Sequence, residues 1–272
     1  MNNYSNQWKI FCEESGDKGI PRSAGSSHFY IITAILVRAE DAEKFRSSIE
    51  EHTFKELRLR QPLEWKQLKS RFKRDDKRIS KFLRRVERDS PEFLITNVFC
   101  NKEETNGPGL VDRNVFMNYL YGLMFRRIAG FLSKTNSRAE LIIDRNTDKM
   151  AQDSLKNYIS DVTRYYTGSH PRHSKPKWIN PEDDPILGMS DFISGVALRS
   201  WTDYVENVSD ECKKCEVTNC MYNCDESNYK YKRSFRYIQK WNYNTLSNWD
   251  WQGLLYHPYV YKDNYPHLIQ PK

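Results

Sequence analysis

The sequence has no apolar run long enough to cross a membrane. Its longest apolar stretch is the nine residues from Phe29 to Val37, which Thr33 interrupts, whereas a spanning helix needs about 20 residues. The first residues, Met1 to Ser5, contain neither the basic region nor the apolar region of a secretory signal. These two absences predict a cytoplasmic protein without a membrane partner.

Several catalytic signatures are also missing. The chain contains no glycine-rich Walker loop, no Gly-x-Ser-x-Gly elbow and no His-Glu-x-x-His pair, so nucleotide triphosphatases, serine hydrolases and zinc proteases are not supported. Disorder is not supported either, because 14% of the residues are aromatic. A chain of 272 residues can bury a full core.

What the sequence does contain is a set of acidic residues in apolar or turn-bounded contexts. They are far apart in the chain and are Glu13 (followed by Glu14), Glu64, Asp144 and Asp191, the last opening a helix-like stretch. Carboxylates in such places are costly unless they are paired, hydrogen-bonded or bound to a metal. Several that converge would form the oxygen-rich site that Mg²⁺ or Mn²⁺ prefers, as in a phosphodiester nuclease. Taken singly, each also fits a turn or a helix N-cap.

The residue pattern predicts a mixture of strands and helices. Strands are expected at residues 8–13, 28–38, 93–100, 139–144 and, briefly, 177–179. Helices are expected at residues 40–58, 75–88, 112–133, 148–166 (with Thr147 as N-cap) and 186–205. This mixture indicates a layered α/β domain. The character of the chain changes after about residue 206, so we expect a main domain at 1–206 and a C-terminal extension at 207–272.

Positive charge is concentrated between Lys66 and Arg88. This segment holds eleven Lys and Arg against three acids, a surplus of eight, whereas the whole chain carries +7. Focused positive charge favours nucleic acid, although a charge run is often only a solvated helix face. The candidate phosphate contacts are Lys69, Arg71, Lys73, Arg74, Lys77, Arg78, Lys81, Arg84 and Arg85.

The motifs around the four acids resemble those of the domain-of-unknown-function 3800 family, in the same order. Glu13-Glu14-Ser15-Gly16 is similar to the family's Asp-Glu-Ser-Gly opening, and Glu64-Trp65-Lys66 to its Glu-x-Lys element. Ile142 to Arg145 is similar to its apolar strand ending in Asp, and Leu187 to Gly195 to its Leu-x-x-Ala-Asp-x-x-x-Gly helix. The resemblance covers about residues 8–205.

The resemblance implies a ribonuclease-H-like mixed sheet flanked by helices and the activity of a metal-dependent nuclease, in a mobile element or in phage defence. It implies two Mg²⁺ or Mn²⁺ ions, with Lys66 near the phosphate or the attacking water and the metals held by Glu13, Glu64, Asp144 and Asp191. Glu14, which follows Glu13, is a further candidate metal ligand. The sequence departs from the family pattern at a position that bears on activity, because residue 13 is Glu where the family has Asp. The extra methylene moves the carboxylate by more than about an ångström, and two-metal sites are sensitive to such shifts. Ser190 in place of Ala is benign.

Four of the six cysteines lie close together, at Cys212, Cys215, Cys220 and Cys224. In a chain without a secretory signal this spacing favours a structural Zn²⁺ that staples the C-terminal extension. Disulfides, free thiols or an iron–sulfur cluster are the alternatives, although the Cys-x₂-Cys-x₂-Cys run is absent. Cys12 and Cys100 are expected to be buried in strands.

Twelve aromatic residues lie between Tyr229 and Tyr265, and Lys and Arg interleave with the first five. This pattern suits single-stranded nucleic acid, where bases stack and phosphates pair. The plainer interpretation is a segment that wraps the main domain and buries its aromatic rings.

The sequence therefore favours a nuclease acting on DNA or RNA, without distinguishing the two. A first alternative is a nucleic-acid-binding or complex-assembly protein that keeps the fold without the activity. A second is a hydrolase of a nucleotide or another phosphate ester, which would not need so basic a segment. An activating or inhibiting protein partner is compatible with each of them.

Overall fold

The computed structural model describes most of the main domain and short parts of the C-terminal extension. The described residues are 7–17, 27, 29–60, 62–66, 75–102, 112–145, 148–167, 172–207, 233–234, 238 and 254–257. The predicted zinc ligands and part of the predicted nucleic-acid contacts lie outside them, namely Cys212, Cys215, Cys220, Cys224, Lys69, Arg71, Lys73 and Arg74. Most of the aromatic residues after Tyr229 lie outside them too.

A mixed sheet forms the centre of the molecule. Its strands are β1 (Gln7–Ser15), β2 (Phe29–Arg38), β3 (Phe93–Asn101), β4 (Arg138–Asp144), β5 (Lys177–Ile179) and β6 (Leu254–His257), in the spatial order β5-β4-β1-β2-β3-β6. Strand β2 runs antiparallel to both of its neighbours, and the other neighbouring strands pair in parallel. Strand β2 is buried along almost its whole length, as its unbroken apolar run predicts.

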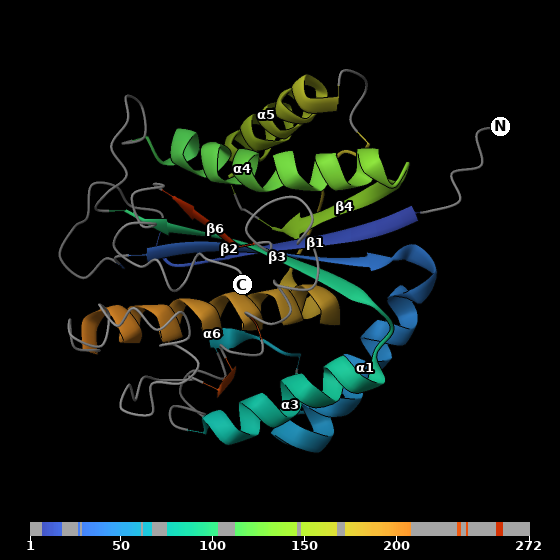
Figure 1. Ribbon diagram of the computed structural model, residues 1–272, viewed down its shortest axis with the longest axis vertical. Coiled ribbons are helices and arrows are strands. Elements are labelled where there is room, and N and C mark those ends of the chain that lie inside the picture. Colours follow the sequence, from blue (N-terminus) through green and yellow to red (C-terminus); the bar gives the residue numbers. More distant parts are fainter. Residues whose placement is uncertain are drawn as a thin grey trace.

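Helices cover both faces of this sheet (Figure 1). One face carries α4 (Arg113–Lys134) and α5 (Lys149–Thr167); the other carries α6 (Pro185–Asn207), with α1 (Ala42–Leu57) and α3 (Asp76–Asp89) on the same side. Two short 3₁₀ turns, η1 (Ala39–Asp41) and η2 (Pro181–Asp183), precede α1 and α6. The predicted α/β class, a mixed sheet flanked by helices, is confirmed.

Each face of the sheet has its own hydrophobic core, because successive side chains of a strand point to opposite faces. In β1, Phe11 packs into the core formed with α1, α3 and α6, whereas Ile10 and Cys12 pack into the core formed with α4 and α5. This alternation directs Glu13 to the α6 face and Glu14 to the α4 face. Cys12 and Cys100 are buried free thiols, as predicted.

One predicted helix start needs correction. Thr147, the predicted N-cap of α5, lies outside the described residues, and the Asp148 carboxylate accepts the N–H groups of Met150 and Ala151, so Asp148 takes the capping role. The helix predicted at residues 186–205 begins at Pro185, so Asp191 lies within α6 and is not its N-cap. Proline suits this first position because its missing N–H would have no partner there.

Parts of the C-terminal extension contact the main domain at three places. The backbone N–H groups of Arg233 and Ser234 donate to the Asp76 carboxylate at the start of α3. Ile238 is fully buried in the core beside α6, and β6 pairs with β3. Strand β6 was not predicted, since its four residues lie in a segment without clear periodicity. No helix within the described ranges is long and apolar enough to cross a membrane.

Candidate functional site

The four predicted acids come from four separate parts of the fold and line one cavity of about 360 Å³. They lie near the end of β1, between α1 and α3, at the last residue of β4 and within α6, and are Glu13, Glu64, Asp144 and Asp191. Glu14 and Glu182 also line this cavity, beside the turn residues Ser15 and Gly16. The structure thus brings together carboxylates that are up to 178 residues apart in the sequence.

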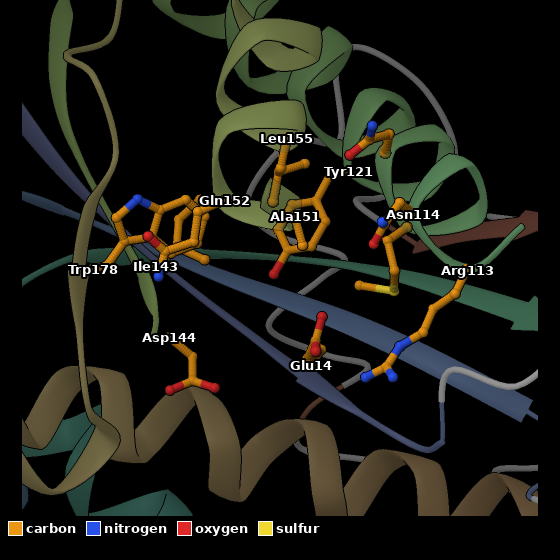
Figure 2. Close-up of a pocket in the computed structure, with 12 residues that line it drawn as sticks. Glu14, Arg113, Asn114, Tyr121, Ile143, Asp144, Ala151, Gln152, Leu155 and Trp178 are labelled. Carbon is orange, nitrogen blue, oxygen red and sulfur yellow. The ribbon is translucent and has the colours of Figure 1, made fainter. Parts of the chain in front are cut away.

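Strand pairing places Glu13 next to Asp144. Strands β1 and β4 run in parallel, and the last pair in their register is Cys12 with Ile143, so the two acids follow at the same edge of the sheet. Ile142 belongs to the core on the α6 side and Ile143 to the opposite core, so the next side chain returns to the α6 side. Figure 2 shows the Asp144 carboxylate extending toward α6, whereas Glu14 points the other way.

Helix α6 provides Asp191 and also receives the segment that carries Glu64. Gly188, Asp191 and Gly195 are spaced three and four residues apart, so they share one face of the helix. A side chain at Gly188 would overlap the carbonyl oxygen of Leu63, and one at Gly195 would overlap the ring of Trp65. The two glycines therefore let the segment from Leu63 to Trp65 lie directly on α6.

A hydrogen bond completes this contact. The backbone N–H of Trp65 donates to Oδ2 of Asp191 at 2.7 Å, so Asp191 is oriented by the residue that follows Glu64. Gly195 accommodates the ring of Trp65, and the Ser194 hydroxyl donates to the backbone carbonyl of Asp191.

Glu13 is almost completely buried, with 3% of its surface exposed. Its Oε2 accepts the backbone N–H of Glu14 at 2.7 Å. The longer side chain is thus folded back toward its own strand. The backbone N–H of Glu14 therefore fixes the orientation of the Glu13 carboxylate.

The carboxylates of the cavity influence one another electrostatically. The pKa of Asp191 is raised to about 6, mainly because the side chain is buried, and repulsion from Glu64 and Asp144 adds to the effect. The hydrogen bond from Trp65 acts in the opposite direction. Because neighbouring carboxylates disfavour one another's ionised form, a cation placed between them would relieve this repulsion.

The donor set fits a hard divalent cation, although the ligands are not yet gathered around one point. All of the acids offer carboxylate oxygens, which Mg²⁺ and Mn²⁺ prefer. Among the described residues, no three His, Cys, Asp or Glu side chains form a ready metal-ligand group. An ion bound in the cavity would have to draw the carboxylates together.

A second, smaller cavity of about 40 Å³ lies on the other face of the sheet, between the strand ends and helices α4 and α5 (Figure 2). Glu14 and Asp144 line it as well, together with Arg113, Asn114, Asn118, Gln152 and Trp178. Glu14 and Asp144 were predicted from the sequence, but the other residues that line this cavity were not, and neither was Glu182. A signal for Glu182 existed, since it lies in the acidic run Pro181 to Asp184 just before the helix that carries Asp191.

The predicted phosphate contacts are less available than the sequence suggests. Lys66 is exposed and does not line the carboxylate cavity. On α3, Lys81 pairs with Glu56 of α1 at 2.7 Å, Arg85 approaches the same carboxylate at 3.7 Å, and Arg78 donates to the Glu56 carbonyl. Within the described part of the chain, Lys77 and Arg84 are the exposed members of this set without an ion pair.

Comparison with protein-family models found no match for this chain, and no curated protein is significantly similar to it. The resemblance to the domain-of-unknown-function 3800 family therefore rests on the four motifs and remains a hypothesis.

Proposed function

We propose that this protein is a metal-dependent nuclease with a ribonuclease-H-like domain. The observation that carries the proposal is the convergence of Glu13, Glu64, Asp144 and Asp191 on one cavity. The fold assignment is supported by the sheet, in which β2 alone among the described strands runs against the others. It is also supported by the origin of the acids in the first strand, a middle segment, a later strand and a late helix.

We infer that these four acids, with Glu14 and Glu182 at the margin, form the ligand set for Mg²⁺ or Mn²⁺. A bound divalent ion supplies Lewis-acid polarisation of a phosphate and lowers the pKa of a water molecule. The protein orients Asp191 through the N–H of Trp65 and holds Glu13 through the N–H of Glu14. Without a cation, this many carboxylates would repel a phosphodiester, so substrate binding at the cavity is expected to require metal.

One observation favours the alternative of a nucleic-acid-binding protein without activity. Among the described residues, no three potential ligands form a ready metal-binding group. In this alternative the carboxylates would stay apart, and the exposed Lys and Arg side chains of α3 would hold the nucleic acid.

A cleavage assay tests the proposal. Labelled single- and double-stranded DNA and RNA are incubated with Mn²⁺, Mg²⁺ or EDTA, using the wild type, Asp144→Asn and Asp161→Asn. Asp161 is a matched control, because its side chain is 75% exposed on α5. We expect metal-dependent cleavage that Asp144→Asn lowers by at least about 100-fold, more than loss of an outer-shell partner usually costs, and that Asp161→Asn leaves unchanged.

Equal cleavage by Asp144→Asn and the wild type would refute the site assignment. No cleavage at all, together with tight and salt-sensitive binding, would favour the binding-protein alternative.

For the C-terminal extension, the proposal of a structural Zn²⁺ at Cys212, Cys215, Cys220 and Cys224 is kept. A closed thiolate site of this kind stabilises the fold and does not catalyse. Elemental analysis should find one zinc atom per chain. A zinc content well under one atom per chain, together with four titratable thiols, would refute the zinc proposal. Phage defence or a mobile element as the setting, and a regulatory protein partner, remain hypotheses.

A further inference from the structure

A larger cavity adjoins the carboxylate cavity. Its volume is about 660 Å³, within the range of about 300–1,000 Å³ that is typical of small-molecule sites. Its walls come from α1, from the segment that follows α1, and from η2 with the start of α6. We call it the α1 groove.

The α1 groove lies next to the candidate catalytic site. Glu182 lines both cavities. Leu63 lines the groove and is followed directly by Glu64, which lines the carboxylate cavity. A ligand held at the carboxylates through a metal can therefore extend into the groove.

The groove has an apolar floor and an exposed aromatic ring at its rim. Ile49 and Leu63 are buried below it, whereas Phe54 is 50% exposed. An aromatic ring placed in this way can stack on a nucleobase, and such stacking tolerates any base because every base has a π-face.

One polar group in the groove lacks a partner. Thr53 lines the groove and is 5% exposed, and its hydroxyl makes no hydrogen bond within the described part of the structure. A buried hydroxyl without a partner is costly. The hydroxyl is shielded from solvent, so a ligand has to shift the groove wall slightly to reach it, and the new hydrogen bond would then remove that cost.

The charge of the rim distinguishes between the parts of a nucleotide. Among the described residues that line the groove, Glu50, Glu182 and Asp183 are acidic and Arg60 alone is basic. Carboxylates repel phosphate, but they accept hydrogen bonds from the amino and imino groups of a base. A nucleotide would thus place its base in the groove and its phosphate at the metal-binding carboxylates.

We propose that the α1 groove binds the base of an unpaired nucleotide next to the scissile phosphate. The inference rests on the proposed nuclease function and adds its substrate class, a single strand. A base in a duplex is paired and stacked, so its Watson–Crick edge cannot reach Thr53 and the acidic rim. Bases with an amino group on that edge, namely adenine, cytosine and guanine, are expected to be preferred over thymine and uracil.

The test uses single-stranded oligonucleotides with one abasic nucleotide at successive positions, and matched duplexes. Affinity is measured in Ca²⁺ by fluorescence anisotropy, and cleavage in Mn²⁺, for the wild type, Phe54→Ala and Thr53→Val. Val115→Ala is the control, because Val115 is similarly exposed (45%) but lies on α4, outside the groove.

We expect Phe54→Ala to weaken binding of the intact strand by about 5- to 150-fold, the range of one base–aromatic stack. Thr53→Val should have a smaller effect and Val115→Ala none. One abasic position should weaken wild-type binding by a similar factor, and Phe54→Ala should add no further loss on that substrate.

The two proposals fail separately. Metal-dependent cleavage with no effect of Phe54→Ala or of any abasic position, or with duplexes cut as fast as single strands, overturns the groove proposal and keeps the nuclease. Weaker binding by Phe54→Ala without cleavage by the wild type supports the base site and refutes the nuclease. Unchanged oligonucleotide binding with a basic, apolar peptide bound in the groove also overturns the proposal, since the occupant is then a protein.

Discussion

At the scale of single residues, the position of Glu64 depends on two positions of α6 that have no side chain. Gly188 and Gly195 leave room for Leu63 and Trp65 to lie on the helix, and the N–H of Trp65 binds Asp191 between them. The same contact therefore sets the positions of two candidate metal ligands. A small change at either glycine should disturb both.

The first prediction concerns Gly195→Ala. The added methyl would overlap the Trp65 ring, so the ring and the adjacent Glu64 must move. We expect a loss of about 1–3 kcal/mol in the free energy of unfolding, as for other overpacked sites, and a loss of metal-dependent cleavage by the folded protein. Urea unfolding and the cleavage assay measure the two effects.

Gly122→Ala is the control for this variant. Its Cβ would lie 2.6 Å from Cε1 of Tyr158, so it overpacks the contact between α4 and α5 and should cost stability without abolishing cleavage. Adding Trp65→Leu to Gly195→Ala should recover stability. Full cleavage by Gly195→Ala would show that the position of Glu64 does not matter.

The second prediction concerns pH in the metal-free protein. Burial, with repulsion from Glu64 and Asp144, raises the pKa of Asp191 from 3.8 to about 6. The folded state then holds this proton more tightly than the unfolded state. The contribution to stability is full below about pH 3.8 and is lost as the pH rises through about 6, by about 3 kcal/mol in total.

In EDTA, Asp191→Asn should therefore be more stable than the wild type at pH 7 and should lack the fall in stability between pH 4 and 6.5. Chemical unfolding across this range measures it. A wild-type stability that rises over the same range, relative to the variant, would contradict the assigned environment of Asp191.

At the scale of elements, most strands and helices could be predicted because each has a clear periodic pattern. Strand β2 has an unbroken apolar run, and α3 has a regular apolar stripe that packs beneath its basic face. The start of α5 was misjudged by one residue, because Thr and Asp are both good caps and only the fold selects Asp148. Strand β6 is stabilised by its pairing with β3, a long-range contact with no local signal.

The third prediction concerns the charges of α3. Lys81 and Arg85 are drawn toward Glu56, whereas Lys77 and Arg84 are exposed without an ion pair among the described residues. Glu56→Gln should free two cations and strengthen nucleic-acid binding. Lys77→Gln with Arg84→Gln should weaken binding and lower the salt slope by about 0.7–0.9 for each phosphate that the variant no longer neutralises.

Fluorescence anisotropy at several salt concentrations measures these effects. Glu43→Gln is the control for Glu56→Gln, because it removes the same charge from an 84% exposed side chain elsewhere on α1. Equal strengthening by both variants would indicate a general effect of net charge, and no dependence on α3 would refute a binding role for this helix.

At the scale of the whole molecule, the carboxylate cavity and the α1 groove are neighbours that share the lining residue Glu182. Both are lined by segments that are far apart in the sequence, and only one of them could be predicted. The four acids were recognisable because they lie in short motifs that follow one another in a known order, whereas each acid alone would also fit a turn or a helix N-cap. The α1 groove was not, because its walls come from segments that are far apart in the chain and carry no motif. The contacts of Asp76, Ile238 and β6 that tie the extension to the domain are equally non-local.

Calorimetric titration of Mn²⁺ into the wild type, Asp144→Asn and Asp161→Asn tests the central claim most directly, because it asks whether the converging carboxylates bind metal at all. The cysteine cluster is the same in all three proteins, so differences between them report on the carboxylate cavity. We predict saturable Mn²⁺ binding that Asp161→Asn retains and Asp144→Asn loses. Identical titrations for the wild type and Asp144→Asn, whether or not a heat of binding is observed, would contradict a metal site at these residues.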